Sequence, residues 1–134
     1  MFVTLLCITL DHKTESLDYV AAGHHPILIR KKNGNIRELE NTGGVPAGLM
    51  EDSVYQQASC PLEAGDSFLA YTDGITESRN LQGEEYGVAR LKESFCRTHS
   101  KALENTPNIL EKVKLFSEGT PAHDDATVLL IQIP

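Results

Sequence analysis

The sequence predicts an α+β fold in which strands come first, two helices follow and one strand returns at the end. Apolar and β-branched runs dominate residues 2–71. After Asp73-Gly74 the apolar period changes from two residues to about 3.6, and a final β-branched run covers Ala126 to Ile133. A block of strands followed by a block of helices indicates an α+β arrangement rather than a repeated βαβ unit.

Composition favours one globular domain in a reducing compartment. The chain has 134 residues, of which 40% are hydrophobic and 23% charged, values typical of a single domain with its own core. A net charge of −7 argues against nucleic acid or an acidic membrane surface as partner. Three widely spaced cysteines fit neither a disulfide framework nor a zinc motif. The cysteines therefore favour a cytoplasmic setting. No stretch is long enough to cross a bilayer, so we expect no membrane segment.

The opening strands are predicted from β-branched runs. Phe2 to Leu10 is apolar or Thr almost throughout, which predicts a strand buried on both faces. Three short apolar runs follow and predict an antiparallel meander, with turns at 23–26 and at Asn33-Gly34. These runs are Leu17 to Ala22, Ile27 to Lys32 and Ile36 to Leu39. The basic cluster Arg30 to Lys32 is interpreted as a solvated strand end.

Further along, Asn41 to Gly48 is rich in glycine and is predicted to be a loop beside a site. Val54 to Ser59 and Ser67 to Tyr71 are predicted strands, separated by turn-forming residues 61–66. In that turn, Gly65-Asp66 predicts a tight bend in which the Asp66 carboxylate bonds nearby backbone amides.

Two helices are predicted in the second half of the chain. The first follows Gly87 and places its apolar residues on one face: Val88, Leu91 and Phe95. The second is expected to begin at Thr106-Pro107, a cap residue followed by proline. Its apolar stripe is Ile109, Leu110, Val113 and Phe116, and Gly119 and Pro121 end it. Ala126 to Ile133 then predicts a central strand.

Two acidic strand ends carry the chemistry that the residues suggest. Asp73 ends the apolar run F-L-A-Y-T, and the following Gly74 permits a close approach of backbone or ligand. Asp124 and Asp125 stand directly before the last apolar run. If the two strands are neighbours, Asp73 and Asp124 converge, and a hard divalent cation such as Mg²⁺ or Mn²⁺ is the usual reason to hold two carboxylates together. The alternative, a D-G turn and a solvated acidic loop, remains open from the residues alone.

Other polar residues are assigned structural roles. His24 and His25 lie in a turn without a third ligand at metal-binding spacing, so we expect no zinc there. Glu77, four residues after Asp73, is expected on the solvated surface. The sequence contains no P-loop, no G-x-S-x-G motif and no Cys-His nucleophile arrangement.

The motifs together resemble the SpoIIE and RsbU-like branch of the bacterial PP2C metal-dependent serine/threonine phosphatases. Six pieces carry the resemblance, in the family's order and from end to end of the chain. They are M-F-V-T-L-L at the start, L-D-Y-V-A-A-G-H-H-P at 17–26, G-V-P-A-G-L at 44–49, G-D-S-F-L-A-Y-T-D-G-I-T-E-S-R-N at 65–80, G-E-E-Y-G at 83–87 and D-D-A-T-V at 124–128. His25 stands where an Asn is frequent in the family, so no functional role beyond the turn is carried over to His24 or His25.

The resemblance implies an α-β-β-α sandwich of mainly antiparallel sheets with a manganese or magnesium pair between the sheets. It implies hydrolysis of phosphoserine or phosphothreonine by metal-activated water, with Asp73 and Asp124 as metal ligands. Gly74 would then allow close backbone approach, and Asp125 would lie beside the metal without binding it. It also implies a phosphorylated anti-anti-sigma (STAS-type) protein as substrate and a sensory or receiver domain upstream on the same chain.

Family members carry a further segment before the M-F-V-T strand, with a G-D-x-x-G-H-G-like stretch that supplies the remaining metal-binding Asp. This sequence shows no counterpart, so the resemblance implies a single partial phosphatase domain over residues 1–134, incomplete at its N-terminus. Two functions therefore stay open. One is the phosphatase itself, and the other is an inactive truncated module that binds a regulatory protein, with a homodimer as one arrangement.

Overall fold

The computed structural model describes residues 1–96, 102–121 and 124–134. Its strands form two antiparallel sheets with the orders β1-β2-β5 and β4-β3-β6-β7. The elements are β1 (Leu5–Asp11), β2 (Ser16–Ala22), β3 (Leu28–Arg30), β4 (Ile36–Glu38), β5 (Ala58–Pro61), β6 (Ser67–Tyr71), α1 (Asp73–Thr76), α2 (Gly87–Cys96), α3 (Ala102–Phe116) and β7 (Val128–Gln132). The α+β class and the mainly antiparallel sheets are confirmed. No helix in the described ranges is both long and apolar enough to span a membrane.

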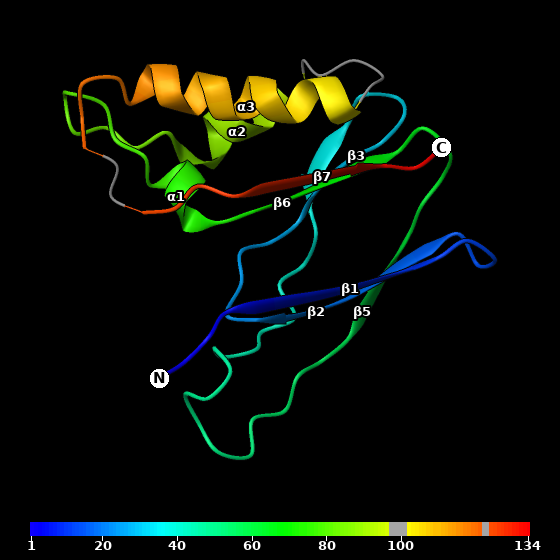
Figure 1. Cartoon of the computed structure of the whole chain (residues 1–134). Coiled ribbons are helices and arrows are strands. Elements are labelled where there is room, and N and C mark those ends of the chain that lie inside the picture. The colour runs from blue at the N-terminus through cyan, green and yellow to red at the C-terminus, as the bar shows by residue number, and fades with distance from the viewer. Residues whose placement is uncertain (97–101, 122–123) are drawn as a thin grey trace.

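The sheets stack face to face, and α2 and α3 cover the outer face of the four-stranded sheet (Figure 1). Strand β6 is buried at all five positions because both of its faces are covered. Leu69 points toward the helices and packs with Leu91 and Phe95. Its neighbour Phe68 points toward the three-stranded sheet and packs with Leu17. One strand thus contributes to both apolar cores, in the alternation that a pleated strand requires.

The predicted meander is wrong at its first connection. β2 and β3 lie in different sheets, because the chain crosses between the layers at residues 23–26. Gly23 adopts a φ of +68° there and donates its amide to the carbonyl of Gly44. The second connection is the predicted hairpin, with Gly34 at a φ of +89° between β3 and β4.

Strands β1 and β7 are edge strands of their sheets, which corrects two predictions. β1 alternates between exposed and half-buried residues and leaves Leu5 52% exposed, so it is not buried on both faces. No helix among the described residues covers the outer face of its sheet. β7 pairs only with β6 in the described part of the chain, although an apolar run was expected to be central. Its residues are apolar because Leu130 packs on the helix side and Ile131 on the other sheet.

Two boundaries also differ from the predictions. The fifth strand is Ala58–Pro61 rather than Val54 to Ser59, and Val54 is 84% exposed. Helix α3 begins at Ala102 rather than at Thr106-Pro107, since good helix formers extend it upstream. Helix α2 has the predicted stripe, with Leu91 and Phe95 fully buried.

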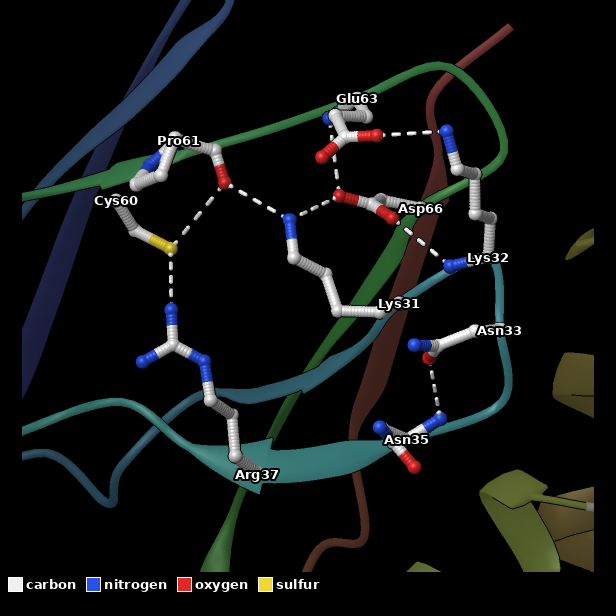
Figure 2. A network of polar contacts seen from close by, with 9 residues as sticks. All are labelled: Lys31, Lys32, Asn33, Asn35, Arg37, Cys60, Pro61, Glu63 and Asp66. Carbon is white, nitrogen blue, oxygen red and sulfur yellow. Dashed lines mark hydrogen bonds and ion pairs between the residues drawn. The ribbon is translucent and has the colours of Figure 1, made fainter.

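The start of β6, at Ser67, is fixed by a network of hydrogen bonds and ion pairs around Asp66 (Figure 2). Asp66 is fully buried, and its carboxylate accepts hydrogen bonds from the amides of Lys32 and Glu63, both at 2.9 Å. Lys31 Nζ donates to Asp66 at 2.6 Å and to the carbonyl of Pro61 at 3.2 Å. The predicted amide bonds of Asp66 are confirmed. The basic cluster is more than a solvated strand end, because Lys31 joins β5 of one sheet to the β6 end of the other.

Candidate functional site

The candidate site lies where β6 ends and β7 begins. The two strands are antiparallel neighbours, and their register pairs Tyr71 with Val128. Asp73, just after β6, and Asp124 and Asp125, just before β7, therefore arrive at the same end of the sheet (Figure 1). The sequence predicts that Asp73 and Asp124 converge if their strands are neighbours of suitable direction. The antiparallel pairing of β6 with β7 meets that condition.

Thr72 joins the two segments through its backbone and its side chain. Its amide donates to the carbonyl of Thr127 at 3.1 Å and so continues the ladder past the last paired residue. Its hydroxyl accepts a hydrogen bond from the amide of Thr127 at 3.0 Å and donates one to the carbonyl of Asp125 at 3.2 Å. The backbone next to the acids is therefore fixed by one side chain.

Gly74 makes the close approach that the sequence predicts. A Cβ atom placed on this residue would lie 2.4 Å from the carbonyl oxygen of Asp125, a distance that real Cβ atoms do not show. Only glycine lets the first turn of α1 pack directly on the segment that leads into β7.

The three acids keep free oxygen atoms near solvent. Asp73, Asp124 and Asp125 are all exposed. Asp73 Oδ1 accepts a hydrogen bond from the amide of Gly74 at 3.0 Å, and Asp124 Oδ1 accepts one from the amide of Asp125 at 2.7 Å. Within the described ranges, the Oδ2 atoms of Asp73 and Asp124 take part in no hydrogen bond or ion pair.

The carboxylates of Asp73 and Asp124 suit a hard cation, but they are only part of the ligands that such an ion needs. Two carboxylates offer oxygen atoms only, which favours Mn²⁺ or Mg²⁺ over Zn²⁺. Among the residues that the structure describes, no three His, Cys, Asp or Glu side chains lie together in a group that could hold a metal ion. Asp73 and Asp124 would thus supply part of a coordination sphere, and the remaining ligands would come from water or from another segment.

A cavity of about 410 Å³ opens beside the acids. Asp124 and Gly74 line it together with Leu110, Val113 and Lys114 of α3. Glu77 also borders the cavity and is exposed, as expected for a solvated residue.

The turn with the two histidines packs against the same end of β6. The ring of His25 stacks on Tyr71 with a centroid distance of 5.7 Å, and His24 Nδ1 lies 2.9 Å from the carbonyl oxygen of His25. These contacts support the turn role that the sequence predicts.

Thr72 is the residue of this site that sequence reasoning missed. Its signal is present, because a Thr directly before the acid of Y-T-D-G occupies the N-cap of α1. A Thr at this position is ordinarily assigned to capping. Here its side chain makes no cap hydrogen bond and reaches across to the β7 segment instead.

Comparisons with known proteins identify the family of this chain. The family model described as Stage II sporulation protein E (SpoIIE) matches residues 1–134. Phosphoserine phosphatase RsbU of Bacillus subtilis (strain 168) is 29% identical over 136 residues, which cover 98% of this chain and 39% of RsbU.

Solved structures match the fold. The phosphatase domain of SpoIIE from Bacillus subtilis, presoaked with Mn, has a TM-score of 0.75 at 22% identity, covering 97% of this chain and 56% of that one. The SiaA-PP2C domain of Pseudomonas aeruginosa has a TM-score of 0.84 at 17% identity, covering 98% of this chain and 52% of that one. The chain therefore spans about half the length of the solved domains that it matches.

Proposed function

This chain belongs to the SpoIIE family of PP2C-type phosphatase domains, and from that premise we propose that it takes part in metal-dependent hydrolysis of phosphoserine or phosphothreonine on a protein. The observation that carries the proposal is the meeting of the Asp73 and Asp124 segments at one end of the β6–β7 pair. One relative of this chain, RsbU, is named as a phosphoserine phosphatase, which supports the proposal.

The chain's own residues would act by holding and orienting. Asp73 and Asp124 present free carboxylate oxygens at adjacent strand ends, where a cation between them would offset their negative charges. Asp73 and Asp124 would hold Mn²⁺ or Mg²⁺, and the chemistry that such an ion would supply when bound is a lower pKa of coordinated water for phosphate ester hydrolysis. The hydrogen bond from the amide of Gly74 keeps one oxygen of Asp73 in place, and the amide of Asp125 does the same for Asp124. Asp125 would lie beside the ion without binding it.

We propose as substrate a phosphorylated regulatory protein of the STAS, anti-anti-sigma type, with a sensory or receiver domain upstream on the same chain. The proposal places the protein in the cytoplasm, which rests on its unpaired cysteines. It treats residues 1–134 as one partial domain, with a homodimer as one possible assembly.

A second candidate is a module that binds a regulatory protein without turnover. It is favoured by the number of ligands, since the described residues bring no third metal-binding side chain to the two carboxylates. The two candidates differ in whether phosphate is released.

The test measures Mn²⁺-dependent phosphate release from a phosphoserine-containing STAS protein, by the 134-residue chain and by the natural gene product that contains it. For the natural gene product, Asp73→Asn should lower the rate by about 100-fold or more, because a ligand is lost. Asp18→Asn, on the other sheet, is the matched control and should leave the rate unchanged. Equal rates for wild type and Asp73→Asn would contradict the proposal. Tight binding of the phosphoprotein without phosphate release, by both proteins, would favour the second candidate.

A further inference from the structure

We infer that Thr72 is a positioning residue whose hydroxyl fixes the spacing of the two candidate metal-binding carboxylates. The inference rests on the proposed function, because it assigns Thr72 to the Asp73 and Asp124 site. The hydrogen bonds that its hydroxyl makes to Thr127 and Asp125 are called the Thr72 clamp below.

In the Thr72 clamp, one hydroxyl group both accepts and donates a hydrogen bond. Thr72 Oγ1 accepts from the amide of Thr127 at 3.0 Å and donates to the carbonyl of Asp125 at 3.2 Å. A hydroxyl that only completed the helix would instead accept from an amide in the first turn of α1. That bond is absent at Thr72, where the backbone is extended with φ −94° and ψ 163°.

The clamp lies one residue from each carboxylate. On the β6 side, Thr72 directly precedes Asp73. On the β7 side, the Asp125 carbonyl that receives the hydroxyl belongs to the residue whose amide donates to Asp124 Oδ1 at 2.7 Å. A short line of contacts therefore runs from one acid to the other through Thr72.

Packing at Gly74 adds to the constraint. The same Asp125 carbonyl lies so close to Gly74 that a Cβ atom there would meet it at 2.4 Å. The carbonyl is therefore held between the clamp on one side and the first turn of α1 on the other. Without the Thr72 hydroxyl, the carbonyl of Asp125 loses its hydrogen bond and is held only by van der Waals contact with Gly74.

Replacing Thr72 by Val removes both hydrogen bonds at nearly constant volume, whereas Ser retains the hydroxyl. Thr42→Val is a matched control. Thr42 Oγ1 also bridges backbone groups, accepting from the amide of Ala21 at 3.0 Å and donating to its carbonyl at 3.5 Å, but it lies in the loop between β4 and β5 and contacts β2 of the other sheet. Each variant is made in the natural gene product that contains the chain and is titrated with Mn²⁺, and the dissociation constant is measured from the loss of the free-ion electron paramagnetic resonance signal. In nuclear magnetic resonance spectra, broadening of the backbone amide signals of Gly74 and Asp125 by the paramagnetic Mn²⁺ locates the ion.

We expect Thr72→Val to raise the dissociation constant for Mn²⁺ by about 10-fold or more, the range seen when a residue that orients metal ligands is lost. Thr72→Ser should stay within about 3-fold of wild type, and Thr42→Val should bind like wild type. Wild-type affinity in Thr72→Val, together with lost binding in Asp73→Asn, would overturn this inference and leave the proposed function standing.

Two other outcomes count against it. Equal Mn²⁺ binding by wild type and Asp73→Asn would overturn the metal site and this inference with it. If Thr72→Val does not fold by urea titration, Thr72→Ala replaces it in the titration. Failure of both variants to fold would overturn the inference, because Thr72 would then be required by the fold as a whole.

Discussion

Strand β6 carries an aspartate at each end, and the two acids lie in opposite surroundings. Asp66, just before the strand, is fully buried and is bonded to Lys31 and to two backbone amides. Asp73, just after the strand, is exposed and accepts one bond from the amide of its own neighbour. The first acid has its bonding capacity used within the fold, and the second keeps an oxygen for a ligand. The difference separates an acid that maintains the structure from one that is available for chemistry.

The largest expected effect is on stability at the buried end. Asp66→Ala should lower the free energy of unfolding by about 3 kcal/mol, because it leaves a lysine and two amides without their partner. Asp73→Ala should leave the urea midpoint unchanged at pH 7 in the absence of metal. Urea unfolding of both variants followed by circular dichroism makes the comparison. Similar losses in the two variants would show that the two ends of β6 do not differ as described.

A smaller effect separates two adjacent lysines. Lys31→Met should lower the free energy of unfolding by about 2 kcal/mol, because Lys31 binds a buried carboxylate. Lys32 pairs with Glu63 across open solvent, with side chains 62% and 56% exposed. Its variant Lys32→Met should therefore unfold at the wild-type urea concentration. If both variants lost stability equally, net charge rather than the buried bond would account for the effect.

The smallest effect is a dependence on pH. Burial alone would raise the pKa of Asp66, but hydrogen bonds from Lys31 and from the amides of Glu63 and Lys32 outweigh it and lower that pKa. The stabilisation is therefore complete above the pKa of an unfolded Asp, near 4, and is lost as pH falls through the lower value of the folded protein.

Urea midpoints between pH 7 and pH 3 test this sign. The stability difference between wild type and Asp66→Asn should shrink as the solution is acidified. A difference that stays constant over that range would mean that folding does not lower the pKa of Asp66.

Features set by neighbouring residues were predictable from the sequence. The Asn33-Gly34 hairpin and the buried stripe of α2 each depend on a few adjacent side chains. The glycine after Asp73 predicted a close approach at Gly74, but not its partner, the distant carbonyl of Asp125. The meeting of Asp73 with Asp124 was predicted on the condition that their strands pair, and the register of β6 with β7 meets that condition. Their role as metal ligands stays a prediction.

Features set by distant partners were not predictable. An apolar strand does not state which sheet it joins, so the crossing at residues 23–26 was taken for a meander turn. The apolar run of β7 fits a central strand as well as an edge strand whose two faces contact different apolar cores. Thr72 was missed because capping, the local explanation for its position, is satisfactory until its partners in the β7 segment are known.

The pairing of β6 with β7 also determines when the site can form during folding. The residues between Tyr71 and Val128 include both α2 and α3, so these strands meet only after a long loop has closed, at an entropic cost that β1 and β2 avoid through their short turn. The hairpin of β1 and β2 is a local event, whereas the alignment of Asp73 with Asp124 depends on the docking of the last strand. A divalent ion bound by both acids would therefore favour the completed fold over every state in which β7 is detached.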